Sequence, residues 1–386
     1  MTVYDPARAY DGYTLYTTGG GQNAFLVGMD GKLLHEWHLP FSAVWDKTAA
    51  VKDPQPDSHI YWEKAYVYPN GDLLAINVAV GDSPWGYGLV KVDKDSKLIW
   101  KYLQHTHHSF DVGSDGKIYA LIHDLRFDVI KGYEHLAPPR IDDYVAILSP
   151  DGKELKRIWV LGAVVNSPYE RLLSTVPWYI SRGEGDFLHT NSIQLVEGDA
   201  ARNMPFAKEG QLLLSFREIG TVAVLDPEKE QIVWGLRGSW LGQHDAEILP
   251  NGHLLLFDNN GHYVQKEKGV VPAALVSRDG KPLEGAGTSR VIEIDPSNEE
   301  IVWRYAGDLK HPFESKVRSA EQRLPNGNTL ITESDGGRLL EVTPDGDIVW
   351  EFINPERGGE AGNLVPITSW GHRFDRDYFD PGFLEP

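Results

Sequence analysis

Histidines recur at one position of a repeated sequence unit, and they are the residues best suited to chemistry in this chain. Each unit contains a turn with a glycine, and His108 and His244 both stand eight residues before that glycine, Gly116 or Gly252. His189 fills the equivalent place at the entry of a more divergent unit. Imidazole titrates near neutral pH, so it serves as a nucleophile, a general acid or base, or a metal ligand. Its repetition at one position favours a shared site over three separate structural roles.

Two interpretations of the three histidines compete. Three imidazoles are a common ligand set for zinc, or the rings act directly in nucleophilic and acid–base catalysis. Asn191 lies two residues after His189, so both side chains project from the same face of a strand. Arg217, on the expected partner strand, carries a fixed fork of donors that suits a sulfate, phosphate or carboxylate group. These neighbours favour an anionic substrate group, and we expect no metal and no cofactor.

Two kinds of strand–turn–strand unit alternate along the chain. The inner kind has turns such as Pro250-Asn251-Gly252, in which proline fixes φ and Asn-Gly tolerates positive φ, as is typical of a β-hairpin. The outer kind has an Asp- or Gly-containing turn and ends in tryptophan. Alternating apolar residues between turns predict paired antiparallel strands. The tryptophans that end the outer units, which we expect to pack between repeats, are Trp37, Trp100, Trp159, Trp234, Trp303 and Trp350.

One inner and one outer unit make a four-stranded sheet, and six such sheets closed into a ring form a β-propeller. We expect the strand at Tyr13–Tyr16 to close the ring against strands near the C-terminus. The fold class is therefore all-β, a six-bladed β-propeller occupying residues 1–386 as one domain. Its blades run from about 13 to 355, and residues 356–386 close the ring or trail from it. Two unrelated β-sandwiches are the weaker alternative, because the repeat spans nearly the whole chain.

The innermost strands of a propeller line its central channel, so equivalent repeat positions converge around the mouth of that channel. His108, His189 and His244 would then face a common space from three different blades. Glu63 and Ser319 stand at the same repeat position, eight residues before their own turn glycines. Glu63 therefore joins the candidates for substrate binding.

Composition narrows the choice of partners. The 386 residues include 41% hydrophobic and 11% aromatic residues, which suffice for a large core. The net charge of −19 argues against nucleic acid or an anionic membrane as the main partner. With no cysteine, the chain has no disulfide and no thiol nucleophile. No apolar run approaches the roughly 20 residues of a membrane span. The N-terminus lacks a signal peptide, so the protein stays inside the cell or a leader has been removed.

Several of these motifs resemble the bacterial arylsulfate sulfotransferases. The resemblance extends from about Tyr13 to Glu351 and rests on the order of its motifs. Those motifs are Asp186-Phe187-Leu188-His189-Thr190-Asn191-Ser192, Leu214-Ser215-Phe216-Arg217, Gln243-His244-Asp245, Leu249-Pro250-Asn251-Gly252, Phe257-Asp258-Asn259, and His107-His108 ahead of Phe110-Asp111.

The resemblance implies a six-bladed propeller that moves a sulfuryl group from a phenolic sulfate ester to a phenol through a sulfohistidine, without a nucleotide donor. His244 would be the nucleophile. His108, His189, Asn191 and Arg217 would hold the sulfuryl oxygens or move protons. The partners would be a small aryl sulfate donor and a phenol acceptor. The well-known members carry a β-domain used for dimerisation, an export signal and a disulfide. This sequence shows none of these, and oligomeric state and compartment stay open.

Other functions stay open beside this one. The same histidines suit sulfate-ester hydrolysis or polysaccharide elimination, with or without a metal, and a propeller also serves as a scaffold that binds a ligand or protein. Because the overall charge is −19, an anionic substrate requires a pocket that is locally positive. Aromatic residues near the channel are candidates for the phenol pocket. They are Tyr61, Trp62, Trp178, Tyr179 and Trp240.

Overall fold

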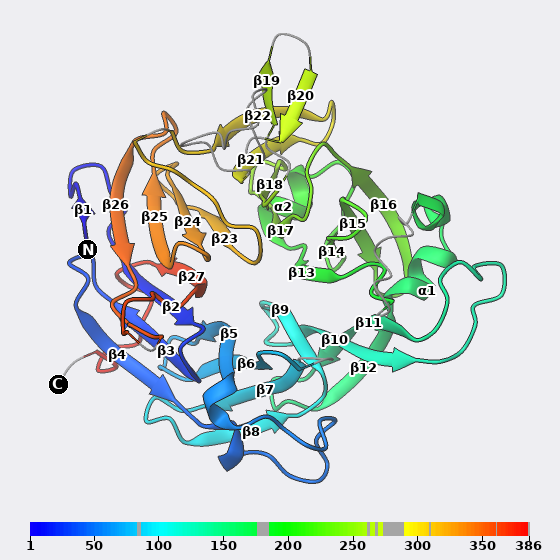
Figure 1. Cartoon of the computed structure of the whole chain (residues 1–386), viewed down its shortest axis with the longest axis horizontal. Coiled ribbons are helices and arrows are strands. Elements are labelled where there is room, and N and C mark those ends of the chain that lie inside the picture. Colours follow the sequence, from blue (N-terminus) through cyan, green and yellow to red (C-terminus); the bar gives the residue numbers. More distant parts are fainter. Residues whose placement is uncertain are drawn as a thin grey trace.

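Short antiparallel strands joined by tight turns make up most of the regular structure of the chain (Figure 1). The computed structural model describes residues 1–82, 86–175, 185–260, 263–266, 269–272, 289–308, 310–359 and 361–384. Helices are short in the described part: α1 (Val160–Val165), α2 (Gly198–Asn203) and the 3₁₀ turns Phe41–Ala43, Asp57–His59 and Glu170–Thr175. None of them has the length and apolar character needed to cross a membrane.

The strands form six sheets arranged in a ring around a central axis, which confirms the predicted six-bladed β-propeller (Figure 1). From the innermost strand outward, blade 1 is β27 (Thr368–Phe374), β2 (Tyr13–Thr18), β3 (Asn23–Val27) and β4 (Leu33–His38). Blade 2 is β5 (Ile60–Val67), β6 (Leu73–Ala79), β7 (Gly86–Val92) and β8 (Leu98–Tyr102). Blade 3 is β9 (Thr106–Val112), β10 (Ile118–Arg126), β11 (Arg140–Leu148) and β12 (Glu154–Trp159).

The remaining three blades repeat the design. Blade 4 is β13 (Thr190–Leu195), β14 (Leu212–Phe216), β15 (Thr221–Asp226) and β16 (Gln231–Arg237). Blade 5 is β17 (His244–Ile248), β18 (Leu254–Asp258), β21 (Arg290–Asp295) and β22 (Glu300–Tyr305), with the hairpin β19 (Tyr263–Lys266) and β20 (Gly269–Pro272) inserted between β18 and β21. Blade 6 is β23 (Ala320–Arg323), β24 (Thr329–Glu333), β25 (Arg338–Val342) and β26 (Ile348–Ile353).

Both ends of the chain close the ring. The C-terminal strand β27 is the innermost strand of blade 1 and pairs with β2, so that Tyr13 lies opposite Phe374. The N-terminal strand β1 (Val3–Tyr4) adds a fifth strand to blade 6 by pairing with β26. Closure by N- and C-terminal strands is confirmed. Each closure joins residues from opposite ends of the sequence, so it protects sheet edges that would otherwise be exposed.

The repeated tryptophans join neighbouring blades. In four outer strands the indole N–H donates to a carbonyl in a turn of the next blade, at 2.8 to 3.2 Å. These bonds run from Trp37 to Gly71, from Trp100 to Pro150, from Trp303 to Pro344 and from Trp350 to Met29. The packing between blades predicted for these tryptophans is therefore observed at all four positions.

Side chains of the inner strands tie the blades together around the channel. A polar side chain on one inner strand accepts the backbone N–H of the following inner strand, which satisfies donors that no sheet partner reaches. The pairs are Glu63 with His108 N–H, Asp111 with Leu195 N–H, Ser192 with Ala246 N–H, Gln194 with Ile248 N–H, and Gln322 with Arg373 N–H. The channel wall is thus fixed laterally as well as within each blade.

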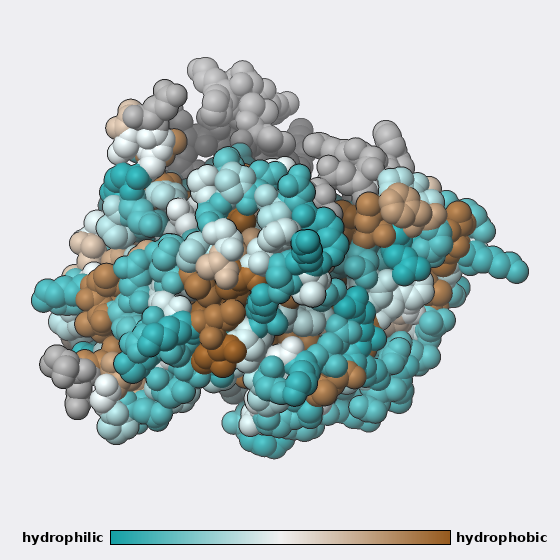
Figure 2. All heavy atoms as spheres, turned by 90° about the horizontal axis from the view of Figure 1, so that it is seen from below, coloured by the Kyte–Doolittle hydropathy of each residue, from teal (hydrophilic) through white to brown (hydrophobic). Residues whose placement is uncertain are grey.

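The outer surface is largely polar. The side view of Figure 2 shows hydrophilic residues over most of the described surface, with small hydrophobic patches between them. This distribution agrees with the net charge of −19.

Candidate active site

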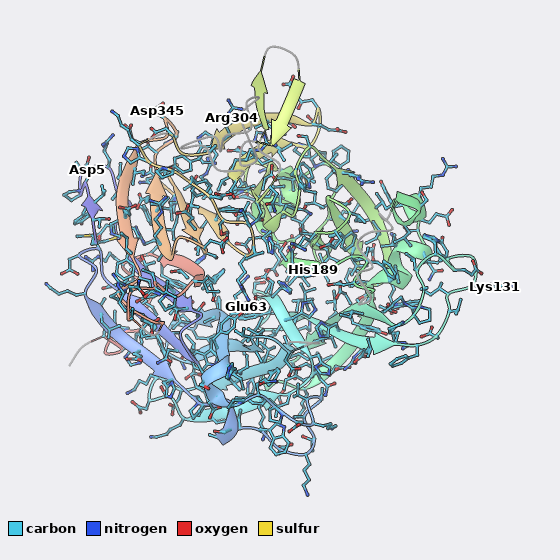
Figure 3. The ribbon with its side chains drawn as sticks, viewed as in Figure 1. Asp5, Glu63, Lys131, His189, Arg304 and Asp345 are labelled. Atoms are coloured by element: carbon cyan, nitrogen blue, oxygen red, sulfur yellow. The ribbon has the colours of Figure 1, made fainter. Side chains whose placement is uncertain are left out.

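One cavity of about 760 Å³ opens at the centre of the ring. It brings together six of the residues predicted from the sequence, which are His108, His189, Arg217, His244, Glu63 and Tyr61. In Figure 3 Glu63 and His189 lie near the centre, on opposite sides of the central space. The lining residues are Gly19, Tyr61, Glu63, Ala79, Val80, Gly81, Asp82, His108, His189, Arg217, His244, Val317, Arg318, Pro366 and Ile367.

Irregularities of the inner strands direct these side chains into the cavity. The pairing register shifts between Trp62 and Ala65 on β5, between Thr190 and Ser192 on β13, and between His244 and Glu247 on β17. On blade 3 the shift is seen on β10, opposite the segment that carries His108. A β-bulge inserts extra residues and re-aims a side chain, and such bulges are frequent next to active sites.

Positive φ angles occur at the same positions. His108 has φ 52°, His189 has φ 49°, and Asp245, directly after His244, has φ 49°. Backbone in this region costs free energy for residues other than glycine and persists only where the surrounding structure enforces it. The three histidines are therefore held in place by the inner strands of blades 3, 4 and 5.

His244 is held in one tautomer. Its Nδ1 lies 2.8 Å from Asn259 Oδ1 and 3.0 Å from the carbonyl oxygen of Gly242. The Asn259 amide donates to the carbonyls of Ser315 (2.8 Å) and Arg318 (2.9 Å), which fixes its Oδ1 toward the histidine. Both neighbours of Nδ1 are acceptors, so Nδ1 carries the proton and Nε2 carries the lone pair. Burial and then the Arg217 charge lower the pKa of His244 to about 3, which keeps the ring neutral.

His189 differs from the neutral His244 ring because it is paired with a carboxylate. Its Nδ1 lies 2.5 Å from the Asp186 carboxylate, and both side chains are mostly buried. Burial alone would lower the pKa of His189, but the Asp186 charge outweighs it and raises the pKa above its ordinary value. The Asp186 carboxylate therefore favours the imidazolium form of the ring.

His108 completes the histidine group. Its ring lies edge-on to the His189 ring with centroids 4.8 Å apart, and its centroid is 6.3 Å from that of His244. Its Nδ1 lies 2.7 Å from the Nδ1 of His107. Burial and then the His189 charge hold the pKa of His108 well below its usual range. Each of the three rings is thus anchored through Nδ1, so Nε2 is the atom that each can offer to a substrate.

Two arginines add positive charge. Arg217 follows β14 directly and forms an ion pair with Glu218. Arg318 precedes β23, lies 3.3 Å from Glu63 Oε1 and hydrogen-bonds to the Tyr61 hydroxyl. Sequence reasoning missed Arg318, because alignment on the turn glycine selected Ser319 as the equivalent position. His189, Arg217 and Arg318 line the cavity, and each is paired with a carboxylate, Asp186, Glu218 or Glu63. The expectation of a locally positive pocket therefore stays a prediction.

Asn191 and Glu63 take supporting positions. Asn191 is 4% exposed, and its amide donates to the Gln243 carbonyl at 2.7 Å, one residue before His244. It lines a narrow neck of about 30 Å³ that also contacts His108 and His244. Glu63 accepts the His108 N–H at 2.9 Å and pairs with Arg318. Both residues therefore contact the histidine group from the side of the channel.

Of the predicted aromatic residues, Tyr61 lines the cavity, but Trp62 and Trp240 do not. Trp62 is fully buried in a hydrophobic cluster and donates its indole N–H to Asn77, because side chains alternate along β5 and its neighbours Tyr61 and Glu63 take the cavity side. Trp240 packs in a second cluster between blades 4 and 5. Neither tryptophan lines the cavity. Trp178 and Tyr179 lie outside the described residues.

Among the described residues, the side chains spaced for a metal are not the cavity histidines but His107, His123 and Asp143, whose ligand atoms lie within 4.8 Å of one another. The rings of His107 and His123 are stacked, with centroids 4.5 Å apart and planes inclined by 25°. The nitrogen lone pairs of the two rings lie in nearly parallel planes, which is unfavourable for convergence on one ion, so we assign no metal to this group.

Comparison with known proteins identifies the relatives of the chain. The sequence model of the family described as arylsulfotransferase (ASST) matches residues 65–355. No curated protein matches the chain. Among solved structures, a protein of unknown function from Bacteroides caccae is similar with a TM-score of 0.53 at 11% identity, covering 93% of this chain and 97% of the other. The WD40 β-propeller domain of Doa1 is similar with a TM-score of 0.45 at 9% identity, covering 90% and 80%.

Proposed function

Because the chain belongs to the arylsulfotransferase family, we propose that it transfers a sulfuryl group from a phenolic sulfate ester to a phenol through a sulfohistidine on His244. The observation that carries this proposal is the fixed tautomer of His244. Asn259 and Gly242 both accept from Nδ1, so the Nε2 lone pair is the nucleophile. A neutral imidazole needs no deprotonation before it attacks.

The transfer has two halves. The Nε2 lone pair forms the N–S bond while the S–O bond to the donor phenol breaks, and the phenol oxygen leaves with the electron pair. The oxygen of a second phenol then attacks the sulfur and the phenol loses its proton, which balances the proton taken up by the first phenolate, and Nε2 departs with its lone pair. This route restores the enzyme and needs no other co-reactant.

Positive groups around His244 suit the charge that develops on the sulfuryl oxygens. Sulfuryl transfer, like phosphoryl transfer, spreads negative charge over equatorial oxygens, so positioned cations lower its barrier. The His189 imidazolium, Arg217 and Arg318 line the same cavity as His244. Their carboxylate partners Asp186, Glu218 and Glu63 hold them in place.

Part of the cavity lining suits an aromatic ring. It combines Tyr61 with the aliphatic side chains of Val80, Val317 and Ile367. Val80 and Val317 are 58% and 39% exposed, which leaves apolar surface available to a ligand. A volume of about 760 Å³ accommodates a small aryl sulfate beside the histidines.

Intact-protein mass spectrometry after incubation with 4-nitrophenyl sulfate tests the proposal. We expect the mass to rise by one sulfuryl group in the wild type, and no rise in His244→Ala. His253→Ala is the matched control, because His253 lies in the same blade but pairs with Glu293 away from the cavity. Addition of phenol should remove the adduct and form phenyl sulfate. An unchanged mass in the wild type would contradict the proposal, and loss of the adduct to water at the same rate without phenol would indicate a hydrolase.

A further inference from the structure

A group of buried side chains lies directly behind His108, on the side away from the cavity. His107, His123 and Asp143 are 2–3% exposed and come from three adjacent strands of blade 3, β9, β10 and β11. They take no part in the transfer described above. Burial of titratable groups is costly, so a cluster of this kind beside an active site calls for a functional explanation.

The group forms a chain of proton-carrying atoms that ends at His108. The Nδ1 atoms of His108 and His107 lie 2.7 Å apart. On the far side of the same ring, His107 Nε2 lies 3.5 Å from Asp143 Oδ1 without forming a hydrogen bond, so proton transfer between them requires the two side chains to approach. The other Asp143 oxygen accepts the Thr190 N–H at 2.7 Å, which fixes the carboxyl group next to blade 4.

Two facing Nδ1 atoms at 2.7 Å share one proton between neutral rings, so the two tautomers are coupled. When that proton is on His107, the proton of His108 is on Nε2, where it can reach a substrate oxygen. His107 Nε2 then carries a lone pair, which fits a protonated Asp143. When the shared proton moves to His108 Nδ1, His108 Nε2 carries a lone pair. His107 Nε2 then carries a proton, and Asp143 is the carboxylate.

From this arrangement we propose that Asp143 and His107 form a buried proton relay, which acts through His108 on the phenol oxygen. The proposal rests on the proposed sulfuryl transfer. In the first half, the His108 Nε2 proton passes to the departing phenolate, the His107 Nδ1 proton passes to His108 Nδ1, and the Asp143 proton passes to His107 Nε2. The phenol leaves neutral, and Asp143 is left as the carboxylate.

The second half runs in the opposite direction. The incoming phenol gives its proton to His108 Nε2 as its oxygen attacks the sulfur, and the shift along the chain returns a proton to Asp143. Atoms and charges balance over the cycle, and no proton is exchanged with solvent. Asp143 and His107 are positioning residues here, because His108 alone touches the substrate.

The protonation states of the buried groups agree with the relay. Burial, and then the neighbouring Asp186 charge, raise the pKa of Asp143 to about 7, so the carboxyl group can both hold and release a proton near neutral pH. Burial lowers the pKa of His107 to about 3. His107 therefore stays neutral, and a concerted shift avoids a buried imidazolium.

Leaving-group dependence tests the relay. A 4-nitrophenolate leaves readily as the anion, whereas an unactivated phenolate needs a proton. In Asp143→Asn we expect sulfo-enzyme formation from phenyl sulfate to slow by about 10²-fold, and formation from 4-nitrophenyl sulfate to slow by no more than about tenfold. The rate would then depend more steeply on the acidity of the leaving phenol. A purely structural role of Asp143 would slow both donors equally, and that result would overturn the relay.

Two further variants keep the test decisive. His107→Gln breaks the middle of the relay and should also slow sulfo-enzyme formation selectively with phenyl sulfate. This variant tests the relay even where Asp143→Asn fails to fold. His123→Phe keeps the stacked ring without joining the chain and should leave the leaving-group dependence unchanged. A stoichiometric metal in the purified wild type, lost in Asp143→Asn, would overturn the relay in favour of a metal site. Failure of the wild type to form sulfo-enzyme with any donor would instead contradict the proposed function.

Discussion

Two cavities lie along the central channel, and the same inner strands line both. The first is the histidine cavity described above. The second, the acidic cavity, has a volume of about 290 Å³ and is lined by five acids, Asp111, Glu197, Asp245, Glu247 and Glu321. The narrow neck that holds Asn191 contacts both His244 and Asp245. These adjacent residues of β17 line different cavities, His244 the histidine cavity and Asp245 the acidic cavity.

The two cavities differ in how their buried ionisable groups are stabilised. In the histidine cavity each cation has a carboxylate partner, so the groups stay ionised. In the acidic cavity Asp111 accepts the Leu195 N–H, and Glu247 accepts the Arg323 N–H at 3.4 Å, but Lys64 is the only lysine or arginine among its described lining residues. Burial is the main cause that raises the pKa values of Asp111, Asp245, Glu247 and Glu321, which favours their protonated forms. Buried charge is thus balanced by ion pairs at one end of the channel, and its formation is disfavoured at the other.

Among the variants that test this difference between the two cavities, replacement of Arg318 should have the largest effect on activity. Arg318→Met takes away one cation of the histidine cavity and leaves Glu63 without its ion-pair partner. Loss of a donor to a developing anion typically costs about 10²–10³-fold in rate, and we expect a fall of that size in sulfuryl transfer. The matched control is Arg323→Met, since Arg323 pairs with Glu293 and does not line this cavity. Comparable losses in both variants would show that the effect is structural.

Removal of the Asn259 side chain should follow in size. Asn259→Ala frees the His244 ring to rotate and to change tautomer, and a misplacement of about 1 Å can cost about 10²-fold in rate. The measurement is the rate of sulfo-enzyme formation, with the melting temperature recorded alongside. Asn260→Ala is the control, because Asn260 also donates to the same loop, at Lys316, without touching His244. Equal rates in the two variants would contradict the role given to Asn259.

Arg318 and Asn259 also show which parts of the site could not be predicted from the sequence. The propeller and its closure were predictable because each hairpin repeats a local pattern of turn residues and apolar alternation. The cavity histidines were found because they occupy one repeat position. Arg318 was missed because it stands one residue away from the aligned position. Asn259 lies within a quoted motif, but its contact with His244 depends on how β18 ends, which no periodic pattern encodes. Trp62 was misplaced because side chains alternate along β5, so that its neighbours Tyr61 and Glu63 face the cavity and Trp62 faces the core.

The pH dependence of transfer should reveal the charge of His189. Because Asp186 raises the pKa of His189, the imidazolium is present at low pH and is lost as the pH rises through that raised pKa. Transfer should therefore fall on the alkaline side. In Asp186→Asn no carboxylate opposes the effect of burial, so the pKa of His189 falls and the alkaline decline in activity should move to lower pH. At a pH above the decline, activity should be about tenfold lower than in the wild type for each pH unit by which the decline has moved. Activity against pH for both proteins provides the measurement.

Glu218→Gln is the matched control for this shift. Glu218 also raises the pKa of His189, but more weakly, because it pairs with Arg217 and not with the histidine ring. We expect a smaller displacement in the same direction. An alkaline decline that stays in place in Asp186→Asn would contradict the assignment of His189 as the cation.

The smallest expected effect tests the acidic cavity and concerns stability. Glu321 is 5% exposed, and neither carboxylate oxygen has a hydrogen-bond partner. Burial, then the charges of Asp245 and Glu247, hold its pKa well above the usual range, and the pKa of Glu247 is raised to about 8. Between the ordinary glutamate pKa of about 4.3 and these raised values the folded state binds more protons than the unfolded state. The free energy of unfolding should therefore decrease as the pH rises.

Glu321→Gln separates this contribution from the general effect of net charge. Glutamine resembles the protonated acid, so the variant should match the wild type near pH 5. Near pH 8 the variant should be more stable than the wild type by about 1–3 kcal/mol. Glutamine forms no buried charge, whereas Glu321 must either ionise in the channel or take up a proton. Glu228→Gln removes one exposed carboxylate and should shift the melting temperature little at either pH. A stabilisation of Glu321→Gln that is the same at both pH values would mean that the side chain, not its charge, is the source. The acidic cavity would then be a packing defect and no longer the counterpart of the ion-paired site above it.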